Sequence, residues 1–173
     1  METLVLNERH LDLNTVSKNI RNEVNRAKRE HLEFRTISQQ EHETHLRAYR
    51  KRKNLLMPPF ALDVERRYYA VVKPDGTYLC SMALYLLDGR LVIQGVSIDE
   101  KCPYYAFSYL VYCGLQLSLK SGHLGLDLAG DGDWKRKWNP QSGQNSLKAG
   151  RSLTGGLFSK FLAKIYWTLK KTE

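Results

Sequence analysis

The feature that most constrains the fold is the stretch 103–120, which carries no charged residue before Lys120. Pro103 suits the first turn of a helix, where its missing N–H costs nothing, and Gly122 suits the C-terminal cap. A helix that is apolar on nearly all sides is usually a buried one. The sequence therefore predicts a buried central helix that other elements must cover.

Three strands are predicted immediately before this helix. They span residues 68–72, 78–87 and 91–98. Pro74-Asp75-Gly76 provides a turn between the first two, and Asp88-Gly89 is a strong two-residue hairpin signal between the last two. Because the connections are short, we expect an antiparallel meander.

Four elements are predicted further upstream: an arm or short edge strand, a helix, a strand and a second helix, at residues 1–12, 14–31, 33–37 and 38–52. The first helix has an apolar stripe at helical spacing, and Ser38 with Glu41 forms a capping box for the second. The order of elements predicts an α+β fold, in which one mixed, mostly antiparallel sheet is flanked by helices.

The segment His123–Pro140 combines a strand pattern with an aromatic and basic cluster. Leu124, Leu126 and Leu128 alternate with smaller or polar residues, which predicts a strand over 123–129 with one buried face and Asp127 on the other face. The turn that starts at Gly130 then leads into Trp134-Lys135-Arg136-Lys137-Trp138.

Three cations between two tryptophans are a candidate site for an anionic ligand, because the stems of Lys and Arg can lie on indole faces while their heads reach phosphate. Lys135 is the main candidate, with Arg136 and Lys137 assisting. The alternative is a solvated surface turn beside two indoles that cap the edge of the core.

The formal net charge of +9 is concentrated at the two ends of the chain. Such asymmetry favours polyanionic partners such as nucleic acid, coenzyme phosphates or an anionic membrane face. The three cysteines lack metal-type spacing and fit free thiols in a reducing cytoplasm. His42 and His45 are interpreted as surface residues, and no metal site is expected.

Element order and motifs together resemble the GNAT acyltransferase fold, and within it the FemAB-like branch, whose members transfer acyl or aminoacyl groups to amines. Ser17–Arg29 resembles the family's basic helix and residues 69–95 its meander. The strand LGLDLAG with WKRKW resembles the signature "FDFGG…(Y/F)K–x–x–F". On that match, Asp127, Gly130, Trp134 and Lys135 occupy the motif positions.

This resemblance implies an N-acyltransferase. The expected donor is an acyl thioester, either acyl-coenzyme A or an acyl carrier protein, and the expected acceptor is an amine on a sugar or on a cell-envelope precursor, small or lipid-linked. Asp127 would orient or deprotonate the amine, although a carboxylate at this position could equally cap the following turn. The residues that would bind the substrate or its phosphate are Trp134, Lys135, Arg136, Lys137 and Gly130.

Two alternatives remain open. The donor could be an aminoacyl-tRNA, whose backbone a chain of this charge could contact. The protein could also be a non-enzymatic basic domain that binds nucleic acid or another protein.

The expected organisation is a single domain over residues 1–173. Residues 153–173 are predicted to form an amphipathic helix, which either contacts a membrane peripherally or packs on the sheet. The expected location is the cytoplasm or the inner face of the membrane. Family members usually carry two tandem GNAT domains, so a homodimer is predicted to replace the pair. Its candidate contacts are apolar N-terminal residues: Leu4, Val5, Leu6, Leu11, Leu13, Val16 and Ile20.

Overall fold

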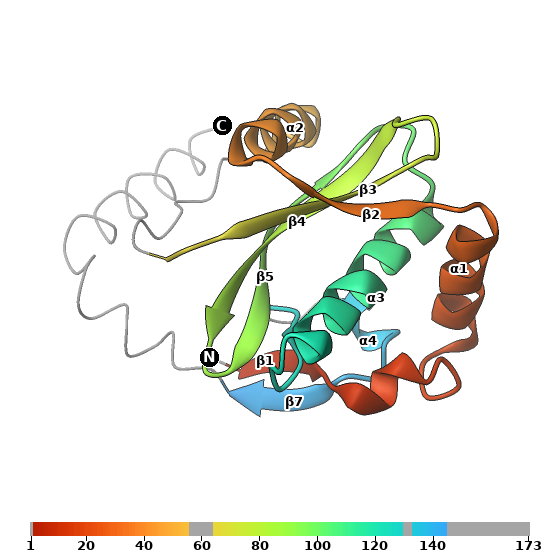
Figure 1. The fold of residues 1–173 in the computed structure, drawn as a ribbon, viewed down its shortest axis with the longest axis vertical. Helices are drawn as coiled ribbons and strands as arrows, with labels where there is room; N and C mark the ends of the chain where they lie inside the picture. The colour runs from red at the N-terminus through yellow and green to blue at the C-terminus, as the bar shows by residue number, and fades with distance from the viewer. Residues whose placement is uncertain (1, 56–63, 130–132, 145–173) are drawn as a thin grey trace, which may run out of the picture.

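The computed structural model describes residues 2–55, 64–129 and 133–144, and it confirms the predicted fold class. Figure 1 shows one twisted mixed sheet flanked by helices. The strands are β1 (Glu2–Leu6), β2 (Glu33–Ile37), β3 (Arg67–Val72), β4 (Tyr78–Leu87), β5 (Arg90–Ile98), β6 (Leu126–Asp127) and β7 (Gln141–Gln144). The helices are η1 (Glu8–Leu11), α1 (Lys18–Arg29), α2 (Gln39–Arg52), α3 (Tyr104–Lys120) and α4 (Asp133–Arg136).

The seven strands lie in the order β2-β3-β4-β5-β6-β1-β7. The strand pairs are antiparallel except for β5 and β6, which run parallel and are joined by the crossover helix α3. The predicted meander of β3, β4 and β5 is confirmed to within one residue at each end.

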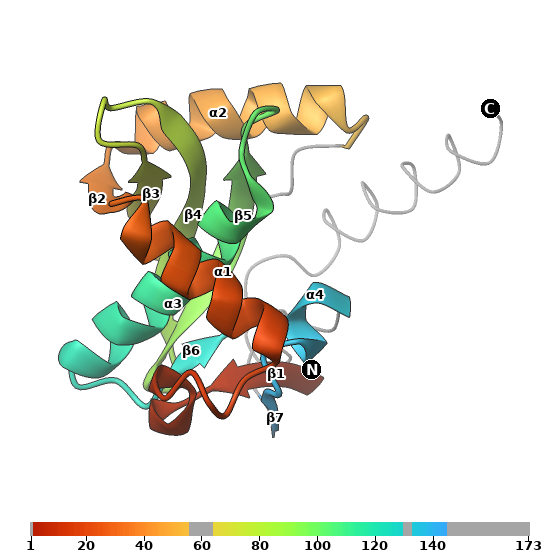
Figure 2. The ribbon, with the colours of Figure 1, turned by 90° about the vertical axis from the view of Figure 1, so that its right-hand side faces the viewer.

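Alternate side chains of β4 point to opposite faces of the sheet and so bury against different helices. Ser81 contacts His42 of α2 on one face, whereas Met82 packs beneath Gly114 of α3 on the other. Helix α1 lies over α3 as a further layer (Figure 2), and Ile20, Val24 and Ala27 form its buried stripe. The core therefore lies mainly between the sheet and the pair α1 and α3.

Helix α3 has the predicted ends. Pro103 is its N-cap, and the chain leaves it through a Schellman motif in which Gly122 donates to Leu119 and His123 donates to Ser118. Ten of its residues are buried, as the lack of charge predicted. Tyr105 and Tyr112 belong to the core, whereas Tyr104 is exposed.

The parallel pair of β5 and β6 is short. Only Leu91 and Val92 of β5 pair with β6, so the carboxyl-terminal half of β5 diverges from it. Between Val96 and Gln94 the register of β5 against β4 shifts, which leaves Gly95, at φ +66°, as the extra residue of a β-bulge. A bulge bends its strand and increases local twist. The bulge at Gly95 therefore lies in the part of β5 that stays paired with β4 but no longer pairs with β6.

The strand predicted over 123–129 is only Leu126–Asp127, and Leu124 is exposed rather than buried. The cause is Gly125, whose φ of +144° and close approach to the Leu6 carbonyl interrupt the extended pattern. Asp127, expected on the other face, is also buried. The predicted alternation therefore holds only for Leu126 and Leu128.

The N-terminal segment is part of the sheet interior rather than an arm or an edge strand. Strand β1 lies between β6 and β7. Val5, Leu6, Val16 and Ile20 are buried within this one chain, so they no longer support the proposed dimer contact. The homodimer itself stays a prediction.

Two other sequence predictions were inaccurate. Helix α1 starts at Lys18, because the Ser17 side chain caps it, and not at residue 14. His42 is completely buried against the sheet rather than on the surface. Gly130 and the helix predicted at 153–173 lie outside the described residues. Within the described residues, the helices are too short or too polar to cross a bilayer.

Candidate functional site

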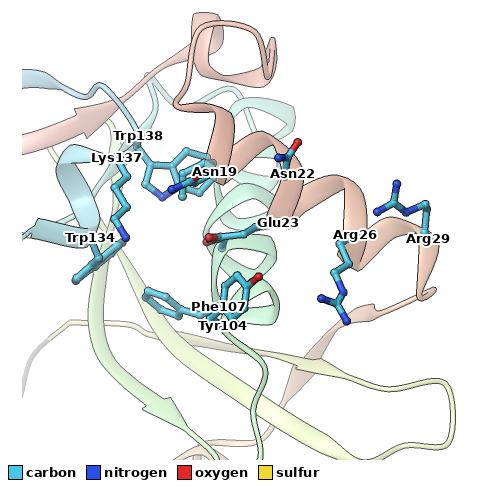
Figure 3. A pocket seen from close by; sticks show the side chains of 12 residues that line it. Asn19, Asn22, Glu23, Arg26, Arg29, Tyr104, Phe107, Trp134, Lys137 and Trp138 are labelled. Atoms are coloured by element: carbon cyan, nitrogen blue, oxygen red, sulfur yellow. The ribbon is translucent and has the colours of Figure 1, made fainter.

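A cavity of about 730 Å³ lies where the chain leaves the carboxyl ends of the parallel strands β5 and β6. The first turns of α3 follow β5, α4 follows β6, and α1 closes the third side (Figure 3). In open α/β arrangements this end of a parallel strand pair is where ligands bind. The lining residues are Asn19, Ile20, Asn22, Glu23, Arg26, Arg29, Tyr104, Phe107, Ser108, Trp134, Lys137 and Trp138.

Helix α1 presents a polar face to the cavity because its apolar stripe is used for packing. Asn19, Glu23 and Arg26 follow one another at helical spacing next to the buried stripe. The Arg26 guanidinium lies 4.5 Å from the centre of the Tyr105 ring, and its Nε is 2.9 Å from an oxygen of Glu30. This ion pair is solvent-exposed, so it holds the arginine only weakly.

Aromatic side chains form the opposite wall. The rings of Phe107 and Trp134 meet edge to face with centroids 4.8 Å apart. Trp138 is completely buried, and its indole Nε1 has no hydrogen-bond acceptor within the part of the chain that the structure describes. Lys137 is exposed, and its carbonyl oxygen accepts a hydrogen bond from the Ser17 N–H that ties this segment to α1.

One carboxylate lies among the cations of the cavity. Glu23 of α1 accepts a hydrogen bond from the hydroxyl of Ser108, a buried residue of α3. Figure 3 shows Glu23 pointing toward the side where Lys137 and Trp134 lie, whereas Arg26 and Arg29 lie at the other end. The lining thus combines Arg26, Arg29 and Lys137 with a single acidic group, and the positive end of the α3 dipole adds to the cationic character.

The short helix α4 turns the side chains of the predicted basic cluster in different directions, so that only some of them line the cavity. Trp134 and Lys137 line the cavity as an anion site requires. Lys135, the main candidate of the cluster, is only 8% exposed, and its Nζ donates a 2.7 Å hydrogen bond to the Ala129 carbonyl. Arg136 is exposed outside the cavity lining, and the position of Gly130 lies outside the described residues.

Asp127 is buried away from the cavity lining. Its Oδ1 accepts hydrogen bonds from the Thr3 hydroxyl and, at 2.7 Å, from the Ala129 N–H. The hydrogen bond from the Ala129 N–H caps the turn that follows β6, which is the second role that the sequence suggested for Asp127. Its catalytic role stays a prediction.

Sequence reasoning missed the Glu23–Ser108 pair. These residues come from α1 and α3, 85 positions apart, so no local spacing relates them. The available signal was the polar series Asn19, Glu23 and Arg26 beside the apolar stripe, which indicates a helix face that is not used for packing.

Comparisons with known proteins identified the fold. No family model matches the chain, and no curated protein matches it. The structure superimposes on FemX with a TM-score of 0.66 at 10% identity, over 83% of this chain and 60% of FemX. The fold is that of the FemAB-like GNAT proteins.

Two further structural matches cover the same share of this chain. One is the C-terminal domain of a protein described as a lysylphosphatidylglycerol synthetase from Agrobacterium fabrum, with a TM-score of 0.64 at 13% identity. The other is L-PGS from Bacillus licheniformis, with a TM-score of 0.60 at 15% identity. Each match covers 83% of this chain but only 58% of the other. The chain therefore spans little more than half the length of these proteins, and the likeness concerns the fold.

Proposed function

We propose that this protein is an N-acyltransferase that moves an acyl group from a thioester donor, acyl-coenzyme A or an acyl carrier protein, to an amine on a phosphate-bearing sugar or cell-envelope precursor. The observation that supports this most is the cationic cavity at the carboxyl ends of β5 and β6. Its volume falls in the range of small-molecule sites.

Arg26, Arg29 and Lys137 suit the phosphate groups that both substrates would carry. Guanidinium groups form bidentate hydrogen bonds with phosphate, and a lysine supplies a mobile point charge. The aromatic wall of Phe107 and Trp134 offers an apolar surface next to these charges.

Acyl transfer also requires stabilisation of the oxyanion that forms at the donor carbonyl. In GNAT proteins the carbonyl often meets a backbone N–H where neighbouring strands splay apart. The bulge at Gly95, beside the divergence of β5 from β6, is the corresponding place here. We propose that the thioester carbonyl lies against β5 at this bulge.

A second candidate is transfer of an aminoacyl group from aminoacyl-tRNA. It is favoured by the two similar structures whose names refer to lysylphosphatidylglycerol synthesis, because that product carries a lysyl group. The formal net charge of +9 is compatible with binding to tRNA phosphates. The aminoacyl acceptor would still use the cationic cavity.

Calorimetric titration with acetyl-coenzyme A, followed by an activity screen on amino sugars and their phosphates, tests the first candidate. We expect the affinity for acetyl-coenzyme A to fall at least tenfold in the double variant Arg26→Ala, Lys137→Ala. Arg47→Ala is the matched control, because this arginine lies on α2, outside the cavity, and its side chain is 70% exposed.

Retention of lysyl-tRNA in a gel shift, with turnover only from that donor, would favour the second candidate. Absence of binding and turnover with both donors would contradict the transferase proposal and leave the non-enzymatic basic domain.

A further inference from the structure

The cavity contains a feature that phosphate binding does not explain. A carboxylate repels phosphate, yet Glu23 lies between the arginines at one end and Lys137 at the other (Figure 3). The Ser108 hydroxyl fixes one of its oxygens, Oε2, from the adjacent helix. A positioned carboxylate in a cationic pocket is suited to a ligand that carries a positive group beside its negative one.

A second observation also indicates a ligand at this place. Trp138 lines the same cavity, is completely buried, and presents an indole N–H without an acceptor among the described residues. Buried polar groups are nearly always hydrogen-bonded, and an unsatisfied donor costs about 1–3 kcal/mol. An oxygen of a bound molecule would satisfy this donor.

We infer that Glu23, held by Ser108, binds the protonated amine of the acceptor, while Arg26 and Arg29 bind its phosphate at one end of the cavity. Lys137, at the other end, adds to the attraction of the cavity for the anion, and the Trp138 N–H binds a hydroxyl oxygen. The ligand class is a phosphate ester that carries a primary amine. This inference rests on the proposed function, and it specifies which carboxylate contacts the amine.

The alternative is that Glu23 only ties α1 to α3 through Ser108. A structural role of that kind would affect the stability of the protein but not its choice between ligands. The decisive measurement therefore compares two ligands that differ in the amine alone.

Glucosamine 6-phosphate and glucose 6-phosphate form such a pair, and their binding is measured by calorimetry on the full chain. The wild type is expected to bind the amino sugar about tenfold more tightly or better, as a hydrogen bond between charged groups predicts. Glu23→Gln keeps an acceptor for Ser108 but removes the charge, so it should abolish the preference while glucose 6-phosphate binds as before or more tightly.

Two further variants keep the test valid if Glu23→Gln folds poorly. Glu23→Asp retains the charge and should retain part of the preference. Lys137→Ala should weaken both sugars by a similar factor and leave the preference intact. Thermal melts of every variant identify any that fail to fold.

Equal binding of the two sugars by the wild type would overturn the inference, as would a preference that survives Glu23→Gln. The inference would also be overturned if Glu23→Gln weakened the binding of lysyl-tRNA but not that of the amino sugar, because Glu23 would then bind an amine of the donor. Because no acyl donor is present, these outcomes are separate from the turnover test of the transferase proposal.

Discussion

The Nζ atom of Lys135 donates a 2.7 Å hydrogen bond to the carbonyl oxygen of Ala129, and this bond joins α4 to the chain that leaves β6. Ala129 has a φ of +56°, a conformation that residues other than glycine adopt only when their surroundings require it. The lysine that resembles the family motif therefore has a structural role beside the cavity.

We expect Lys135→Ala to lower the free energy of unfolding by about 1–3 kcal/mol, because it removes a part-buried hydrogen bond from a charged donor to the Ala129 carbonyl. Urea denaturation measures the change. Lys137→Ala is the matched control, since this exposed side chain should alter stability by less than about 0.5 kcal/mol while reducing affinity for phosphate ligands. Equal midpoints for the wild type and Lys135→Ala would contradict the structural role.

Gly125→Ala should be among the most destabilising single changes in the sheet. A Cβ at this position would lie 2.1 Å from the Leu6 carbonyl oxygen, and the residue has a φ of +144°. The combined clash and strain should cost more than about 3 kcal/mol. Gly122→Ala is the control: its φ of +77° carries strain, but its Cβ meets open space, so about 1 kcal/mol is expected. A thermal melt that ranks the two variants in the opposite order would refute this account.

Stability should fall as the pH drops below 6.5 because of His42. Burial lowers the pKa of this residue to about 4 from its ordinary value of 6.5. The folded state then favours the neutral imidazole, so the unfolded state binds the proton more tightly. The contribution of His42 to the free energy of unfolding is fully present above pH 6.5 and is lost as the pH falls toward 4. The loss between pH 7 and pH 4.5 is on the order of 2 kcal/mol.

Urea midpoints at several pH values test this, with His42→Gln expected to flatten the profile. His31→Asn is the control, because His31 is exposed and its φ of +52° suits asparagine. The prediction fails if His42→Gln leaves the pH dependence unchanged.

The three cysteines should differ in reactivity. Burial raises the pKa of the Cys113 thiol to about 11 and raises that of Cys80, so little thiolate forms at pH 8. Cys102 is only partly buried. Mass spectrometry after brief iodoacetamide treatment should find Cys102 modified first, and all three modified in urea. Fast labelling of Cys80 in the native protein would show that the sheet opens readily.

The meander and the central helix could be predicted from sequence because their signals are local. Asp88-Gly89 fixes the hairpin between β4 and β5, and Pro103 with Gly122 bounds α3. By contrast, β7 has a sequence with little strand preference, Gln-Ser-Gly-Gln, and it forms because β1 supplies its hydrogen bonds.

A small part of the candidate site was predictable for the same reason. Trp134 and Lys137 come from one short segment whose composition indicates an anion site. The burial of Lys135 depends on the path of the chain after β6, and the approach of Glu23 to Ser108 depends on how α1 packs on α3. Neither relationship has a local sequence pattern.

The position of β1 between β6 and β7 has a consequence for how the molecule folds. Thr3 and Asp127, which bond across this part of the sheet, are 124 positions apart in the chain. At a synthesis rate of roughly 5–20 residues per second, the first strand leaves the ribosome several seconds or more before its partners exist. Contacts between such distant residues form slowly. We therefore expect strand β1 to join the sheet late, and α4, which follows β6, to complete the cavity only at that stage.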